Sequence, residues 1–254
     1  MKKKAFNDNA VIYGYANSAA EEFAKNNDIK FVAVNSHDEY LSLLTYSDTD
    51  NSSYKSAIDE LSQLGIINGF EDGTFKPQDN VTRAQAATMF ATALGYSDTK
   101  YQNIATDKAV FSDFLMSHWA YKYADYVMKS ADISSGETNC ILSGFEDGTF
   151  RPDNNVTIIQ LLKMAICSLG EDGYMVEAVE NGGYPNGYNT VAEKYGFSKD
   201  IVFDDVNQPA TREQTAQILS NAINMPIKRI ESINSITADH KTESEKILSN
   251  IRRQ

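Results

Sequence analysis

The sequence has few of the residues on which most catalytic and metal sites depend. Its 254 residues include only two cysteines, three histidines and one tryptophan. The histidines are well separated, without H-x-x-x-H or another metal-site spacing. The sequence also contains no nucleotide-binding glycine loop, no G-x-S-x-G and no H-E-x-x-H. We therefore expect no metal, no cofactor and no enzymatic activity.

Basic residues are outnumbered, and long apolar runs are missing. Lys and Arg number 23 against 35 Asp and Glu, which gives a net charge of −12. We expect no nucleic-acid partner, because a nucleic-acid or anionic-membrane surface needs a basic patch. No segment reaches the roughly 18 apolar residues of a membrane span, so no membrane insertion is expected. The residues after the opening Met-Lys-Lys-Lys also lack the apolar stretch of a signal peptide.

The dominant feature of the sequence is an internal repeat. The segment GFEDGTFKPQDNVTRAQ spans residues 69–85, and GFEDGTFRPDNNVTIIQ begins 75 residues later, at 144–160. A third, weaker copy ends in DDVNQPATREQ at residues 204–214. One such unit is too small to bury its own apolar face, so we expect neighbouring units to share a core.

Each copy has the pattern of a turn or extended segment that leads into a helix. Gly73 and Gly148 can adopt positive φ and shape acidic turns, which lack the alternating oxygens and closing glutamate of a calcium loop. The pattern T-x-x-Q then occurs three times and predicts capping boxes at helix starts. The predicted N-caps are Thr82, Thr157 and Thr211, and a one-sided apolar stripe follows each.

An arginine follows the capping threonine in two of the three copies, as Arg83 and Arg212. A helix N-terminus offers unpaired amides and a partial positive charge, and a guanidinium adds a bidentate donor, so the pair suits a carboxylate or phosphate. The alternative is that both arginines are solvated or pair with a neighbouring repeat. Trp119 is a candidate platform for a sugar ring or, equally, a packing anchor between units.

The pattern G-[FY]-x-D-G-T-F-x-P, followed by an apolar residue and T-R-A-E, resembles the S-layer homology module. The resemblance covers residues 46–226 and includes SHWAYKYADYV before the second unit's helix and GGYPNGY before the third. It implies a mainly α fold, in which three tandem helix-loop-helix repeats form a pseudo-threefold body with short extended segments.

The resemblance also implies a function and a location. Such modules hold proteins non-covalently at the cell surface, cell wall or S-layer of Gram-positive-type bacteria. Their partner is a secondary cell-wall polysaccharide, often with a pyruvylated terminal sugar, and the arginine of T-R-A-E contacts it. We therefore predict carbohydrate-binding roles for Arg83, Arg212 and Trp119.

The chain departs from the family pattern in three respects. Gln replaces Glu in all three capping boxes, Ile158 stands where the second copy should carry arginine, and the third copy lacks GFEDGTF. We therefore expect at most two arginine-bearing sites. Two alternatives stay open: a degenerate scaffold for self-association or S-layer assembly, and the attachment module of a truncated extracellular enzyme.

The expected order of domains follows from the repeats. We expect an N-terminal segment of unassigned role at 1–46, repeats at 47–98 and 109–170, a connector with the third repeat at 171–226, and a tail or linker at 227–254. Cys140 and Cys167 fit one disulfide or two free thiols. Local patterns predict helices at 19–25, 39–44, 53–64 and 190–195, a strand at 29–34, and an inserted loop at 130–142.

Overall fold

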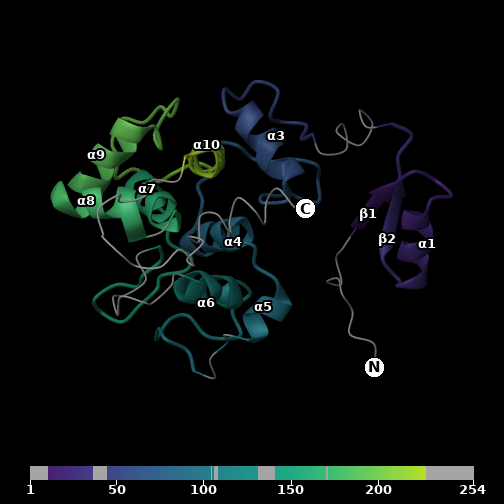
Figure 1. Ribbon diagram of the computed structural model, residues 1–254, viewed down its shortest axis with the longest axis horizontal. Helices are drawn as coiled ribbons and strands as arrows, with labels where there is room; N and C mark the ends of the chain where they lie inside the picture. Colours follow the sequence, from purple (N-terminus) through teal and green to yellow (C-terminus); the bar gives the residue numbers. More distant parts are fainter. Residues whose placement is uncertain are drawn as a thin grey trace, which may run out of the picture. The chain divides into compact units, whose positions relative to one another are not determined.

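The computed structural model describes residues 11–36, 45–103, 105, 108–130, 141–169 and 171–226 (Figure 1). The described residues are mainly helical, which confirms the predicted fold class. The chain divides into a small unit, 1–46, and a larger unit, 47–254. The predicted helix at 39–44, most of the predicted inserted loop with Cys140, and the tail at 227–254 lie outside the described residues.

The small unit contains two strands and one helix. Strand β1 (Val11–Gly14) pairs in parallel with β2 (Lys30–Ala33), and helix α1 (Ala19–Asn26) connects them. Ser18 caps the helix by accepting a hydrogen bond from the amide of Glu21 at 3.4 Å. The sequence predicted the helix and the second strand, whereas the first strand lay in a segment with no clear periodicity.

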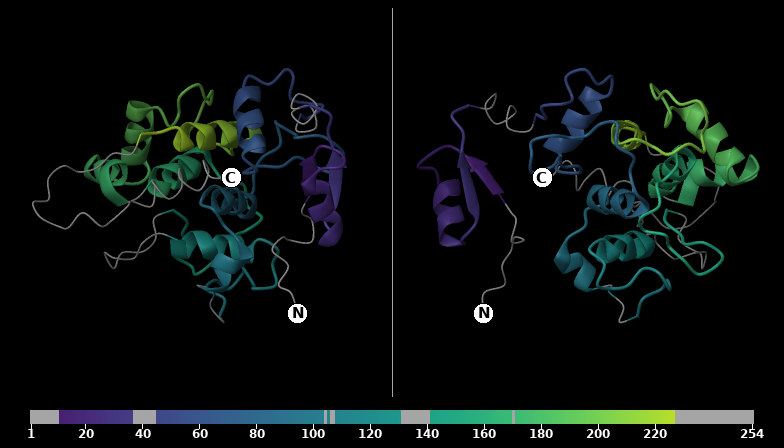
Figure 2. Two further views of the ribbon diagram at one scale, coloured as in Figure 1. Left: turned by 45° about the vertical axis from the view of Figure 1, so that its right-hand side comes forward. Right: turned by 180° about the vertical axis from the view of Figure 1, so that it is seen from behind.

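Six of the helices in the described part of the larger unit pack as three pairs, whose arrangement can be followed in Figures 1 and 2. The helices after the capping threonines are α4 (Arg83–Ala93), α7 (Ile158–Ser168) and α10 (Arg212–Ile223). The helices that open the units are α3 (Lys55–Gln63), α6 (Tyr121–Ser130) and α9 (Asn186–Tyr195). Helix α4 packs against α6, α7 against α9, and α10 against α3. Each capped helix thus contacts the opening helix of the next unit, and the last contacts the first.

The segments before the three capped helices close into a ring of hydrogen bonds. The amide of Val81 donates to the carbonyl of Ala210 at 3.0 Å, that of Ala210 donates to Val156 at 2.9 Å, and that of Val156 donates to Val81 at 2.9 Å. All three residues are buried. This ring gives the three segments the same cyclic relation to one another, although the third lacks the GFEDGTF sequence.

The starts of the three capped helices are fully engaged within the fold. Thr82, Thr157 and Thr211 each form both hydrogen bonds of a capping box. The amides of Arg83 and Arg212 donate to Asn154 and Asp79 carbonyls, both at 2.9 Å, and the amides that follow bond to carbonyls of the same neighbouring turns. The prediction of unpaired amides at these helix starts was therefore wrong, because the adjoining unit supplies their acceptors.

Shorter helices complete the larger unit. They are α5 (Asp98–Gln102), a π-helical turn (Glu171–Met175) and α8 (Val176–Glu180). Helix α9 begins four residues before the predicted start at 190. The prediction missed residues 186–189 because they carry little apolar periodicity. Gly187 lies so close to α8 that a Cβ atom would stand 1.9 Å from the Ala178 carbonyl oxygen, so glycine permits this packing.

Candidate functional site

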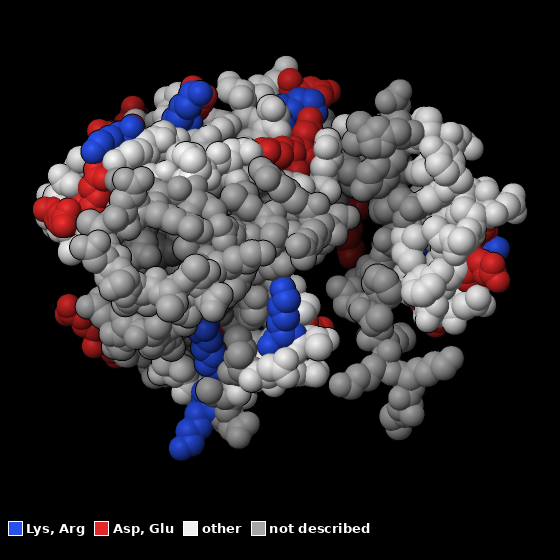
Figure 3. Space-filling model, in the orientation of Figure 1, with Lys and Arg blue, Asp and Glu red and all other residues white. Residues whose placement is uncertain are grey.

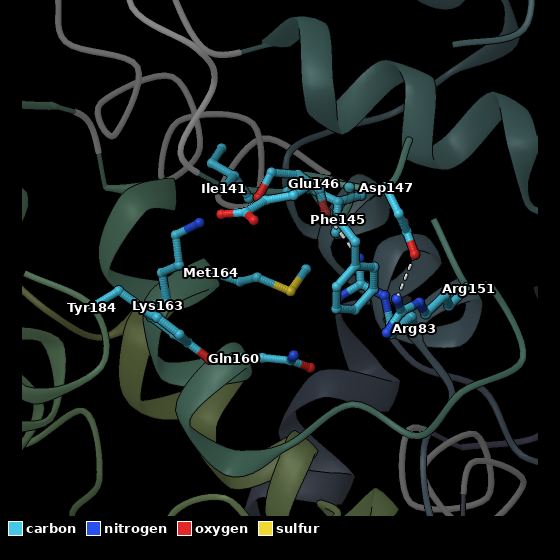
Figure 4. Close-up of a pocket in the computed structure, with 13 residues that line it drawn as sticks. Arg83, Ile141, Phe145, Glu146, Asp147, Arg151, Gln160, Lys163, Met164 and Tyr184 are labelled. Atoms are coloured by element: carbon cyan, nitrogen blue, oxygen red, sulfur yellow. Dashed lines mark hydrogen bonds and ion pairs between the residues drawn. The ribbon is translucent and has the colours of Figure 1, made fainter. Parts of the chain in front are cut away.

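A groove of about 650 Å³ lies between the start of α4, the turn of the second unit and helix α7 (Figure 4). This size suits a small saccharide, since ligand sites commonly measure about 300–1,000 Å³. The groove brings together residues from separate parts of the chain. They include Arg83, Ile141, Phe145, Glu146, Asp147, Arg151, Gln160, Lys163, Met164 and Tyr184.

Arg83 joins the first unit to the turn of the second. Its Nε donates to the carbonyl of Phe150 and its Nη2 to that of Ser143, both at 2.8 Å. The guanidinium also lies 4.8 Å from the ring centroids of Phe145 and Phe150, within cation–π range. Only 7% of the residue is exposed. Arg83 is therefore a structural clamp as well as a wall of the groove.

No carboxylate among the described residues forms an ion pair with Arg83, although the charge of Asp113 is near enough to raise its pKa slightly. Within the described part of the chain, Arg83 makes no ion pair, and its Nη1 has no hydrogen-bond partner. Burial lowers the pKa of Arg83 to about 10, and the nearby positive charge of Arg151 adds to the effect. The group still carries its proton at neutral pH. A buried cation at a groove wall that has no ion-pair partner among the described residues favours an anionic ligand.

Arg212 has the same contacts at the turn of the first unit. Its Nε donates to the Phe75 carbonyl at 2.7 Å and its Nη2 to that of Asn68 at 3.0 Å. Its guanidinium lies 4.9 Å from the Phe70 ring and 4.5 Å from that of Phe75, and 5% of the residue is exposed. In the second unit the same position holds Ile158, which is fully buried. Recurrence of the arginine thus has a structural cause, the clamping of the next turn.

The acidic turns are held by their own side chains. The carboxylate of Asp147 accepts from the amide and hydroxyl of Thr149 at 3.0 and 2.5 Å, and it pairs with Arg151 at 2.7 Å. These contacts, the Thr149 hydroxyl first, lower the pKa of Asp147 to about 2. Gly148 and Gly73 have φ of +76° and +79°, which favours glycine at both positions.

Sequence reasoning missed a second acidic residue at each turn. Asp113 accepts from the amides of Phe150 and Arg151 at 2.7 and 2.8 Å, and Asp48 accepts from those of Phe75 and Lys76, both at 2.8 Å. Both aspartates follow an aromatic-Ser pair, in YSD at 46–48 and FSD at 111–113. The motif also occurs as YSD at 96–98, where Asp98 accepts from Tyr96 and Lys122 instead, so only its place before a GFEDGTF turn marks the two residues.

Among the exposed aromatic residues of the larger unit, Trp119 and Tyr184 present the largest exposed fractions. Trp119 is 57% exposed and lies beside the His118 ring, but it is not among the residues that line this groove. Tyr184 is 50% exposed and does line it, on the side away from Arg83 (Figure 4). Sequence reasoning noted Tyr184 only as part of GGYPNGY, because its distance to Arg83 depends on the tertiary fold.

One cysteine, Cys167, lies among the described residues of the larger unit. Cys167 is buried, and its thiol donates to the Tyr188 hydroxyl at 3.8 Å. Among the residues described, no group of three His, Cys, Asp or Glu side chains could hold a metal ion. No helix of the described ranges is long and apolar enough to span a bilayer. In Figure 3, Lys and Arg side chains lie next to Asp and Glu along the upper rim of the larger unit.

Comparison with known proteins places two parts of the chain in one class. The model of the S-layer homology domain matches residues 45–87 and 110–157. The third predicted repeat, at 171–226, lies outside both matches, so the expectation of three such modules stays a prediction. Both matched regions contain a GFEDGTF turn and the capping threonine that follows it.

Several curated relatives are proteins of bacterial surfaces. The chain is 40% identical over 91 residues to Cell surface glycoprotein 1 of Acetivibrio thermocellus, which is 36% of this chain and 3% of that protein. It is 36% identical over 92 residues to the Cellulosome-anchoring protein of the same organism, 36% of this chain and 18% of that protein. It is 26% identical over 170 residues to the Middle cell wall protein of Brevibacillus brevis, 67% of this chain and 14% of that protein.

The chain therefore spans less than a fifth of the length of these relatives. The domain matches and the relatives support a cell-surface or cell-wall location.

Proposed function

We propose that this chain anchors a surface protein to the bacterial cell wall by non-covalent binding of an anionic secondary cell-wall polysaccharide. The observation that supports this proposal best is the groove in which the buried charge of Arg83 has no carboxylate partner among the described residues. The name of one relative, a cellulosome-anchoring protein, agrees with an anchoring role.

In the proposed complex, each side of the groove makes a different contact. An acidic group on the terminal sugar, such as the carboxylate of a pyruvyl ketal, lies against Arg83 and accepts a hydrogen bond from Nη1. The face of the sugar ring stacks on Tyr184, since aromatic rings present an apolar face with a polar edge. The anion compensates the desolvated guanidinium, so binding stabilises the protonated arginine further.

Two grooves of this kind are proposed, one at Arg83 and one at Arg212. Arg212 bonds to carbonyls of the first unit's turn as Arg83 bonds to those of the second. Trp119, which does not line the Arg83 groove, is proposed as a separate platform for a sugar ring. We also propose that residues 171–226 form a third unit of the same type, on the basis of the hydrogen-bond ring at Val81, Val156 and Ala210. At Ile158 no arginine is present, so no anion contact is proposed there.

A structural role without polymer binding is the second candidate. It is favoured by the engagement of Arg83 and Arg212 with backbone carbonyls of neighbouring turns. In that case the arginines serve only to join the units, and the body is a scaffold for self-association. The two candidates differ in whether the intact fold binds a wall polysaccharide.

Co-sedimentation with bacterial cell walls tests the proposal, before and after acid extraction of the secondary polysaccharide. We expect the purified protein to sediment with intact walls and to stay in solution with extracted walls. Tyr184→Ala should weaken binding and Tyr184→Phe should keep it, because the ring remains. Trp119→Ala measures the contribution of the other proposed platform.

Two results would contradict the proposal. Failure to sediment with walls that retain a known S-layer homology protein favours the scaffold. Equal sedimentation with intact and extracted walls excludes the polysaccharide as the partner. Circular dichroism of each variant shows whether the fold is retained, so that a binding defect is not mistaken for unfolding.

A further inference from the structure

Lys163 is a second cation of the Arg83 groove that sequence reasoning did not consider. It lies on α7, half-buried, and it lines the groove on the side away from Arg83, with Phe145 and Met164 between them (Figure 4). Within the described ranges Lys163 has no carboxylate partner within 4.0 Å. The groove thus has an uncompensated positive charge on each of two sides.

The other charged residues of the groove do not cancel this pair. Arg151 is matched by Asp147, at 2.7 Å. Glu146 is exposed at the rim of the groove, where water screens its charge, and it makes no ion pair with any described residue. The two cations that a ligand can meet unpaired are therefore Arg83 and Lys163.

The other two units lack a cation at this position. Lys163 is the sixth residue after the capping Thr157, and the sixth residues after Thr82 and Thr211 are Thr88 and Gln217. The Thr88 hydroxyl donates to the Ala84 carbonyl at 3.1 Å. Neither residue can replace the charge of a lysine. At this shared position a lysine therefore occurs only beside the Arg83 groove, and the proposed groove at Arg212 has Thr88 there.

We infer that Lys163 makes the Arg83 groove selective for an acidic saccharide with two anionic groups, one on the terminal sugar and one on the neighbouring sugar. This inference rests on the proposed function and concerns only the second contact. The first anionic group lies at Arg83, and the second pairs with the Lys163 ammonium. The Arg212 groove, with Thr88 in place of Lys163, accepts the same terminal sugar without preference for the second charge.

Two synthetic disaccharides test this inference by calorimetric titration of the full chain. Both have a pyruvyl ketal on the terminal sugar, and the second sugar is glucuronic acid in one probe and glucose in the other. For the Arg83 groove we expect the diacid to bind about fivefold more tightly, which equals about 1 kcal/mol, the upper end for an exposed ion pair. Lys163→Thr, with the residue found at the matching place on α4, should abolish this preference.

Two matched variants sharpen the test. Glu146→Gln removes the rim carboxylate and should strengthen diacid binding about twofold, because it removes repulsion. Thr88→Lys should give the Arg212 groove the preference that it lacks. Lys163→Thr should weaken binding of the glucose probe less than binding of the diacid, because the singly charged probe makes no direct contact with the ammonium.

The outcomes separate this inference from the proposed function. If the unaltered chain binds neither probe, the proposed function itself fails for ketal-bearing saccharides, and this inference fails with it. If both probes bind equally, or if Lys163→Thr weakens both to the same degree, the inference is overturned while the proposed function stands. The inference is supported if the unaltered chain prefers the diacid to the glucose probe and Lys163→Thr does not.

Discussion

Replacing Arg83 by alanine should destabilise the larger unit strongly. The change removes two hydrogen bonds from a charged donor, to the carbonyls of Phe150 and Ser143. Such bonds contribute roughly 1.5–3 kcal/mol each, and contacts with the rings of Phe145 and Phe150 add roughly 1–2 kcal/mol. Because water can reach part of the vacated site, we expect a loss of about 4 kcal/mol in the free energy of unfolding. Domains are commonly stable by roughly 5–15 kcal/mol.

Thermal and urea unfolding, followed by circular dichroism, measure this loss. For a unit of this size about 4 kcal/mol corresponds to a drop in Tm of about 10 °C. Arg83→Lys should lose about half as much, since an ammonium keeps the charge but cannot reach both carbonyls in the fork geometry. Arg151→Ala is the matched control, because its ion pair with Asp147 is exposed and contributes roughly 0–1 kcal/mol.

The reasoning is refuted if Arg83→Ala costs less than about 1 kcal/mol. In that case the guanidinium does not hold the turn, and the whole fork is available to a ligand. A large loss instead means that Arg83→Ala is unsuitable as a test of binding, because it damages the fold. For that reason the binding tests above use Tyr184 and Lys163, at the surface of the groove.

Three further predictions concern the caps, the ring closure and pH. Thr157→Ala should cost about 1 kcal/mol in chemical unfolding, as the loss of an N-cap commonly does; Thr157→Ser, which keeps the hydroxyl, should cost much less. Glu213→Ala should cost about 2–3 kcal/mol in the free energy of unfolding, because its buried carboxylate accepts hydrogen bonds from Ser52 and Gln78 at 2.6 Å each and so joins the last unit to the first. An unchanged midpoint of urea unfolding would contradict this closure of the units. The pKa of Asp147 is lowered to about 2 from an ordinary value near 4, so its contribution to folding stability is complete above about pH 4 and is lost as the pH falls towards 2. Unfolding measured over this pH range should show the loss in the unaltered chain and not in Asp147→Asn.

The parts of the fold that could be predicted from the sequence depend on neighbours along the chain. A capping box at Thr157 joins residues three apart, and the apolar stripe of α7 repeats within one helix, so both are visible in the letters. Gly148 has its positive φ because of a turn of four residues. Repetition of these patterns was enough to predict units that share a core.

The candidate site could not be predicted in the same way. The carbonyl partners of Arg83 lie 60 and 67 residues further along the chain, so its burial depends on how the units close. The same holds for Tyr184 and Lys163, which join the groove from separate segments. The sequence argument for an anion site relied on unpaired amides at the helix start, whereas the fold pairs them with the adjoining turn. The contact of the guanidinium with a neighbouring repeat was left open as an alternative.

The most direct test of the central claim is a calorimetric titration of the intact chain with acid-extracted secondary cell-wall polysaccharide. We predict saturable binding that weakens as the salt concentration rises, since the contact is between opposite charges. Tyr184→Ala should raise Kd about fivefold or more, and Tyr184→Phe should leave it nearly unchanged. An absence of binding, or one Kd shared by the unaltered chain and Tyr184→Ala, contradicts the assignment of the Arg83 groove as the polysaccharide site.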